Sequence, residues 1–131
     1  MIDIEADVFD AVYDAIAALV PQGNFTSELD TAPASLPHVT LYERINLWDK
    51  AHQSQALTQE FALLGYEAII DAETRSECRE IGSVMDREMG KLNFLPDNNG
   101  MTFDIQQDEK RFVRLILRYV ARTDGERVYR A

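Results

Sequence analysis

The chain has 131 residues, of which 46% are hydrophobic and 27% are charged, so we expect one soluble globular domain over residues 1–131. Its formal net charge of -10 argues against a protein that grips nucleic acid with its whole surface. Cys78 is the only cysteine, which excludes an internal disulfide framework and favours a reducing compartment. The acidic start does not resemble a signal peptide, and no stretch approaches the roughly 20 apolar residues of a membrane span.

The first predicted element is an amphipathic helix. Apolar residues recur at three- and four-residue spacing from Ile4 to Leu19, which is the pattern of a helix with one buried face. Asp3 is its expected N-cap, and Pro21 is expected to end it. The composition of residues 22–36 then turns to small and polar types, which predicts a long loop.

Two strands are expected next. Apolar and polar residues alternate over residues 37–42, and we expect this strand to fade into a loop over 43–55. Trp48 and its apolar neighbours have no predicted place in the core, so they either cover a sheet edge or form an exposed anchor for a partner. A second strand is predicted for residues 57–70. A helix over residues 56–64 is the alternative, because Ala, Leu, Gln and Glu favour helices.

A second helix and a β-hairpin complete the predicted elements. Thr74 with Glu77 three residues later forms a capping box, which marks a helix start, and Cys78 is expected to face the core. This helix ends before Pro96. A third strand over residues 101–106 is expected to turn back through 107–109 into a long antiparallel strand.

This last strand, residues 112–122, has two chemically different faces. One face is an apolar stripe made by Val113, Leu115, Leu117 and Tyr119. The other face alternates arginine with hydrocarbon, through Phe112, Arg114, Ile116, Arg118, Val120 and Arg122. Such a mixture favours a protein–protein contact, and the predicted interface comprises Arg114, Ile116, Arg118, Arg122 and Trp48. The acidic front half of the chain and its basic tail neutralise each other either between neighbouring copies or within one chain, and the sequence leaves both open. Replacing Arg114 and Arg118 with glutamate is expected to leave the monomer folded and to abolish assembly.

These elements predict an α+β fold. The order is α-β-β-α-β-β, in a two-layer sandwich of a mostly antiparallel four-stranded sheet with two helices on one face. The other sheet face is then either solvated or covered by a partner.

The element order, the length, the loop after the first helix, the segment Pro37–Glu43 and the final hairpin resemble the tail terminator (tail-completion) proteins of tailed bacteriophages. The resemblance spans most of the chain, including the strand Phe112-Val-Arg-Leu-Ile-Leu-Arg-Tyr-Val-Ala-Arg. It implies a single tail-terminator-like domain and a structural protein of the virion tail or neck, made in the cytoplasm of a host bacterium. A head–tail neck protein or minor tail protein is the near alternative.

The resemblance also implies partners. Members of this family form a ring, usually a hexamer, that caps the tail tube, ends its polymerisation and joins it to the head-side neck. The expected partners are therefore other copies of the chain, the tail tube protein and a neck or connector protein. DNA would pass through the lumen only as cargo, and an acidic ring suits such passage because it does not hold phosphates.

Enzyme chemistry is weakly indicated. Asp97 and the triplet Asp108-Glu109-Lys110 match the letters of the restriction-type nuclease site that binds Mg²⁺, but the triplet falls in a polar turn rather than on an apolar strand. His38, His52 and Cys78 lack the spacing of a metal site. We therefore expect no catalytic residues, no cofactor and no metal. A nucleic-acid track along the arginines is disfavoured because Tyr119 lies on the opposite face.

Overall fold

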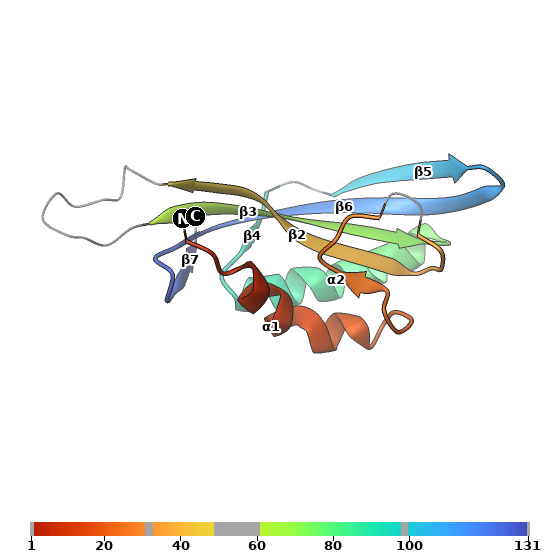
Figure 1. Ribbon diagram of the computed structural model, residues 1–131. Helices are drawn as coiled ribbons and strands as arrows, with labels where there is room; N and C mark the ends of the chain where they lie inside the picture. Colours follow the sequence, from red (N-terminus) through yellow and green to blue (C-terminus); the bar gives the residue numbers. More distant parts are fainter. Residues whose placement is uncertain (1, 31–32, 49–60, 98–99, 131) are drawn as a thin grey trace, which may run out of the picture.

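The computed structural model describes residues 2–30, 33–48, 61–97 and 100–130, and this part of the chain contains two helices and seven strands (Figure 1). The helices are α1 (Glu5–Ala17) and α2 (Arg75–Lys91). The strands are β1 (Phe25–Thr26), β2 (His38–Trp48), β3 (Ala62–Ala72), β4 (Leu95–Pro96), β5 (Met101–Gln107), β6 (Lys110–Thr123) and β7 (Val128–Arg130).

The seven strands form one sheet. Its body is β2-β3-β6, paired antiparallel, and β1 adds a parallel pair at the outer edge of β2. Along the other edge of β6 lie β5, β4 and β7, which pair in turn with residues 110–116, 119–120 and 121–123. The α+β class is confirmed. The expectation of four strands is wrong, because β1, β4 and β7 have only two or three residues, too few to give a periodic signal.

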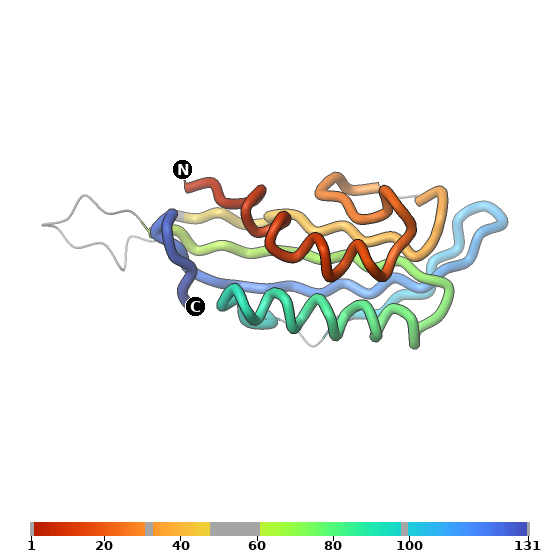
Figure 2. The backbone as a smooth tube through the Cα atoms, turned by 90° about the horizontal axis from the view of Figure 1, so that it is seen from below, coloured from red at the N-terminus to blue at the C-terminus, as the bar shows by residue number. Residues whose placement is uncertain are grey.

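Both helices lie on the same face of the sheet (Figures 1 and 2). The core between the two layers takes Val8, Val12 and Ile16 from α1 and Cys78, Ile81, Met85 and Met89 from α2. From β6 it takes the predicted stripe of Val113, Leu115, Leu117 and Tyr119, all buried. No helix among the described residues covers the other face. We call it the open face, with Tyr42, Glu67, Ile69, Asp71, Arg114, Ile116 and Arg118 at its centre.

The helix starts differ from each other. Thr74 is the N-cap of α2, and its hydroxyl accepts the backbone N–H of Glu77 at 3.2 Å, as predicted. The Glu77 Oε1 atom, by contrast, is buried without a hydrogen-bond partner. Asp3 is not the N-cap of α1: Ile4 occupies that position, and the Asp3 carboxylate instead accepts the Glu5 N–H at 3.2 Å.

The first two long strands also depart from the sequence expectation. β2 does not end near residue 42 but continues to Trp48, paired with β3 on both sides of an irregularity at Arg44. Residues 62–64 are strand, which rules out the helical alternative there, and residues 49–60 lie outside the described part of the chain. The predicted loop over 22–36 contains β1. Asn24 fixes this segment, because its side-chain amide donates to the Ser35 and Pro37 carbonyl oxygens at 3.1 and 2.8 Å.

Candidate assembly interface

Three rows of side chains cross the centre of the open face, because antiparallel register places directly paired residues on the same side. The first row is His38, Asp71, Arg114 and Phe103. The second is Thr40, Ile69, Ile116 and Met101, and the third is Tyr42, Glu67 and Arg118. The arginines thus stand opposite carboxylates of β3, with an apolar row between the two charged rows.

The central arginines are neutralised within the chain. Arg114 binds both carboxylate oxygens of Asp71, with Nε–Oδ1 and Nη2–Oδ2 distances of 2.8 and 3.1 Å. The Asp71 side chain is 1% exposed and that of Arg114 is 16% exposed. The hydrogen bond to Asp71 raises the pKa of Arg114, and the guanidinium also lies 5.6 Å from the centre of the Phe112 ring. This pair is therefore a buried, bidentate element of the sheet.

The second charged row repeats the arrangement. Arg118 Nε donates to Glu67 Oε1 at 3.0 Å, and the Tyr42 hydroxyl donates to the other oxygen of Glu67. Burial, followed by the bond to Glu67, raises the pKa of Tyr42 to about 12, so this hydroxyl remains a donor at neutral pH. Arg114 and Arg118 are therefore both neutralised by carboxylates of their own chain. This is one of the two alternatives that the sequence left open.

The predicted interface residues of β6 share one face, as expected. Arg114, Ile116, Arg118 and Arg122 are all half-buried and alternate with the core stripe. Arg122 stands between Leu63 of β3 and Tyr129 of β7. Trp48 is the last residue of β2, and its side chain lies outside the described part of the structure.

Exposed apolar side chains at both ends of the open face were missed by the sequence reasoning. Among the described residues, six large apolar side chains are exposed, and four of them lie on this face: Leu47, Met101, Phe103 and Tyr129. Met101 and Phe103 lie on the β5–β6 hairpin, whereas Leu47 and Tyr129 lie near the other end of the sheet. This concentration of apolar surface on one face is a feature of contact sites.

A β-bulge places Leu47 there. Glu43 pairs with Tyr66 and Ile45 pairs with the adjacent Gly65, so Arg44 is an extra residue in β2. Without it, Ile45 and Leu47 would follow the alternation of Leu41 onto the core face. The extra residue turns them onto the open face instead. Ile45 there covers Gly65, where a Cβ atom would lie only 3.1 Å from the Ile45 Cβ.

Polar contacts from the start of the chain hold the bulge. Glu5 Oε2 accepts the Glu43 N–H at 2.6 Å, and the Asn46 side-chain amide donates to the Ile2 carbonyl oxygen at 2.6 Å. The Glu43 carboxylate accepts from Asn46 at 3.3 Å and from the Tyr66 hydroxyl at 3.5 Å. Burial, and then the nearby charges of Glu5 and Asp3, raise the pKa of Glu43.

Glu43→Gln is expected to stabilise the protein at pH 7 by roughly 0.5 kcal/mol, because the unfavourable charge is gone while the side chain keeps both hydrogen-bond partners. The amide oxygen can accept from Asn46, and the amide NH2 can donate to the Tyr66 hydroxyl oxygen. A carboxyl whose pKa is raised by folding destabilises the fold when ionised. The advantage of the variant should therefore shrink as pH falls from the raised pKa toward the unfolded value near 4.3. Urea denaturation of wild type and variant at pH 7 and pH 4 measures the difference in unfolding free energy at each pH. An equal difference at pH 7 and pH 4 would contradict a raised pKa of Glu43.

The letters of a nuclease site are not brought together. The Asp97 N–H donates to the Arg118 carbonyl oxygen at 2.8 Å, so Asp97 lies level with Arg118 on β6. Lys110 begins β6, and Asp108 and Glu109 form the hairpin turn before it. Eight residues of strand at about 3.3 Å each separate the two levels by about 26 Å, too far for one metal site.

The suggested metal ligands are also apart. His38 lies on the open-face side of β2, whereas the Cys78 thiol is buried in the core, where it donates to the carbonyl oxygens of Ile70 and Val113. Burial raises the pKa of Cys78 to about 11, which suits a core residue rather than a nucleophile. His52 lies outside the described residues, and within them no three His, Cys, Asp or Glu side chains are grouped to hold a metal.

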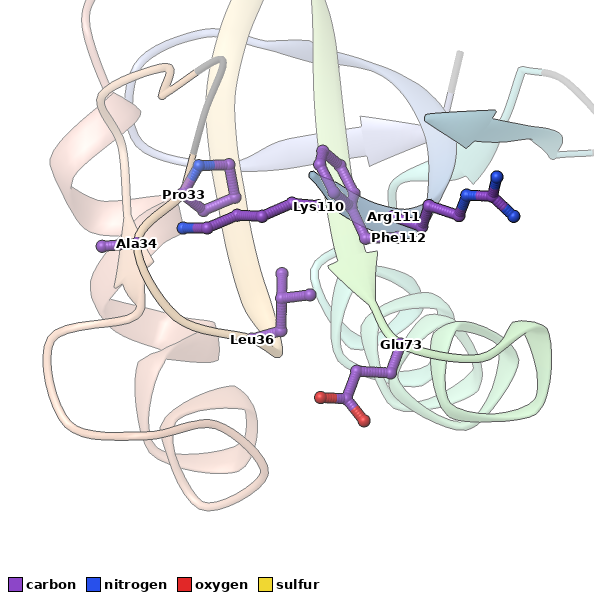
Figure 3. Close-up of a pocket in the computed structure, with 7 residues that line it drawn as sticks. All are labelled: Pro33, Ala34, Leu36, Glu73, Lys110, Arg111 and Phe112. Atoms are coloured by element: carbon purple, nitrogen blue, oxygen red, sulfur yellow. The ribbon is translucent and has the colours of Figure 1, made fainter. Parts of the chain in front are cut away.

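A shallow depression of about 480 Å³ lies at the base of the hairpin (Figure 3). It is lined by Pro33, Ala34, Leu36, Glu73, Lys110, Arg111 and Phe112. Leu36 and Lys110 extend across it, while the Arg111 guanidinium points away. Its lining mixes both signs of charge with apolar groups. The polar side chains that line it do not converge on one point, as they would in a catalytic centre.

Comparison with known proteins finds a similar fold among solved structures. No family model matches the sequence, and a search of curated proteins finds no match. Among solved structures, the chain is similar to a protein in the virion of a native gene transfer agent particle, with a TM-score of 0.51 and 12% identity. The match covers 85% of this chain and 91% of the other. At this identity the likeness concerns the fold. In the described residues, neither helix is long and apolar enough to cross a membrane.

Proposed function

We propose that this chain is a structural protein of a phage-like virion. The observation that carries the proposal is the open face, which presents exposed apolar residues at both ends of the sheet. The fold shared with a protein of a gene transfer agent virion supports it. Such a protein acts by making contacts with its neighbours in the particle, and it is located in the virion.

More particularly, we propose a single-domain tail terminator: a ring of copies, six in the usual form, that caps the tail tube and joins it to the head-side neck. The two apolar ends of the open face support a head-to-tail contact, because two different patches on one chain generate a ring when the rotation closes. The tube protein and a neck protein are the other partners, and DNA passes through the lumen.

The ion pairs change which residues we assign to this contact. Arg114 and Arg118 are held by carboxylates of their own chain, so they present little net charge to a partner. A phosphate track along β6 is disfavoured for the same reason. Contact energy should come instead from apolar groups such as Leu47, Phe103 and Ile116, with the ion pairs giving the surface its shape.

The test is assembly of tail tubes in the presence of the purified protein. A terminator should bind one end of each tube, stop its growth and appear there as a ring by electron microscopy, with a mass near six times 14.9 kDa. A neck protein would bind only tubes that are already capped. Failure to bind either kind of tube would overturn the proposal.

Leu47→Glu is expected to weaken tube capping about tenfold or more, because it places a charge in the proposed apolar contact. The fold should stay intact, because the Leu47 side chain is 56% exposed. Leu29→Glu is the matched control: Leu29 is also 56% exposed but lies in the loop after β1. Capping titrations followed by light scattering would compare the two. Equal effects of both substitutions would contradict the assignment of the open face.

A further inference from the structure

The outer edge of β5 is unpaired. β5 pairs with β6 along its whole length, and no other strand among the described residues pairs with it. Alternate residues of this seven-residue strand therefore turn their backbone N–H and C=O groups toward an accessible sheet edge. The hairpin that carries this edge extends along the end of the sheet opposite to the two chain termini (Figures 1 and 2).

The opposite edge of the sheet is protected by several devices. β1 pairs with Val39 and Thr40 of β2, and the Glu5 carboxylate accepts the Glu43 N–H further along the same strand. The bulge at Arg44 then interrupts the regular ladder. Coverage, a side-chain acceptor and a bulge are recognised means of preventing strand addition.

β5 has almost none of these devices. It contains no proline, lysine or bulge, and it is longer than an average strand. Its single charge is Asp104, which pairs with Arg75 of α2 at 3.4 Å. On its open-face side are Met101, Phe103 and Ile105, of which Phe103 is 43% exposed. An edge of this kind is a template for another strand.

We propose that two copies of this chain pair antiparallel along their β5 edges, related by a two-fold axis, with Phe103 opposite the partner's Phe103. This register places Met101 opposite the partner's Ile105 and Thr102 opposite the partner's Asp104. Every cross-strand pair then joins apolar with apolar or polar with polar, which stabilises a sheet. If the two-fold axis passed through Asp104 instead, Asp104 would lie opposite the Asp104 of the second copy. Two like charges would then face each other, which is unfavourable.

The pair is a state of the free protein and does not rest on the proposed ring. An edge-to-edge pair has two-fold symmetry and leaves the open face uncovered, whereas a head-to-tail ring uses that face. Purified protein without tail components therefore tests the pair alone, and failure of tube capping would leave the result unaffected.

The first measurement is the mass of the purified protein by size-exclusion chromatography with light scattering across a concentration series. Wild type should approach twice 14.9 kDa as concentration rises. Phe103→Lys should raise the dissociation constant about tenfold or more, because like charges then face each other across the axis. Leu47→Lys, a control on the same face but another strand, should leave the pair unchanged.

The second measurement fixes the register. Phe103→Cys should form an intermolecular disulfide under mild oxidation, because directly opposed residues have Cα atoms about 4.5–5.5 Å apart. Cys78 is buried and should not react in the folded protein. Ile105→Cys, whose partner would be Met101, should cross-link far more slowly. A wild type that is monomeric at every concentration, or equal cross-linking of the two variants, would overturn the proposal.

Discussion

Replacing Arg114 with methionine is expected to lower the free energy of unfolding by about 3–5 kcal/mol. The Asp71 carboxylate is 1% exposed, and both of its oxygens are bonded by the Arg114 guanidinium. Methionine keeps much of the length of the side chain but removes the charge and the donors. An uncompensated carboxylate is then left inside the sheet, and its desolvation penalty is no longer offset. Urea denaturation followed by circular dichroism measures the loss.

Two further variants separate this cause from a general effect of losing arginine. Arg111→Met removes an exposed guanidinium that makes no ion pair among the described residues, so stability should change by about 0.5 kcal/mol or less. Adding Asp71→Leu to Arg114→Met should recover most of the loss, because the buried charge is gone. If Arg114→Met costs no more than Arg111→Met, the pair is not a stabilising element of the fold.

The buried carboxylate of Asp71 also overturns an expectation drawn from the sequence. The alternation along β6 predicts that replacing Arg114 and Arg118 with glutamate leaves the monomer folded, because both side chains lie off the core face. With Asp71 as the direct neighbour of Arg114 on β3, glutamate at position 114 would place two carboxylates together in a buried site. We now expect Arg114→Glu to destabilise the monomer at least as much as Arg114→Met.

The two faces of β6 could be read from the sequence because alternation is a local property of an extended chain. The partners of the arginines could not. Asp71 precedes Arg114 by 43 positions, and only the register of β3 against β6 places them side by side. That register depends on the whole set of strands, so the sequence alone left intermolecular and intramolecular neutralisation equally open.

The apolar ends of the candidate interface were hidden for a different reason. Ile45 and Leu47 continue the alternation of Val39 and Leu41, so a strict period of two assigns them to the core side. The inserted residue Arg44 reverses that assignment. A clue was present in the sequence: Trp48 and its apolar neighbours had no place in the predicted core.

The bulge in β2 changes the chemistry of the open face. A regular β2 would bury Ile45 and Leu47 and leave the open face more polar at that end. The bulge gives the face a second apolar patch, opposite the one on the hairpin, while the central ion pairs keep its net charge low. A face with two separate apolar patches and little free charge is suited to contact with protein rather than with phosphate.

Leu117→Ala is expected to cost about 2–5 kcal/mol of stability, as a large-to-small change in a closely packed core. α2 lies close to the sheet at Gly82, where a Cβ atom would be 3.4 Å from Leu117 Cδ1 and 3.0 Å from Leu115 Cδ2. On the sheet edge, a Cβ atom at Gly100 would lie 3.3 Å from the other methyl of Leu117, Cδ2. Because Gly82 and Gly100 have no side chains, neither can change a rotamer to fill the space that alanine leaves.

Val120→Ala provides the comparison on the same strand. Val120 is half-buried on the open face, so its truncation leaves no enclosed cavity and should cost less than about 1 kcal/mol. Urea denaturation of both variants compares them directly, and similar losses would mean that the open face is packed as tightly as the core. The result also decides how assembly variants are interpreted, since a loss of capping in Leu47→Glu reports on a contact only if the open face contributes little to folding.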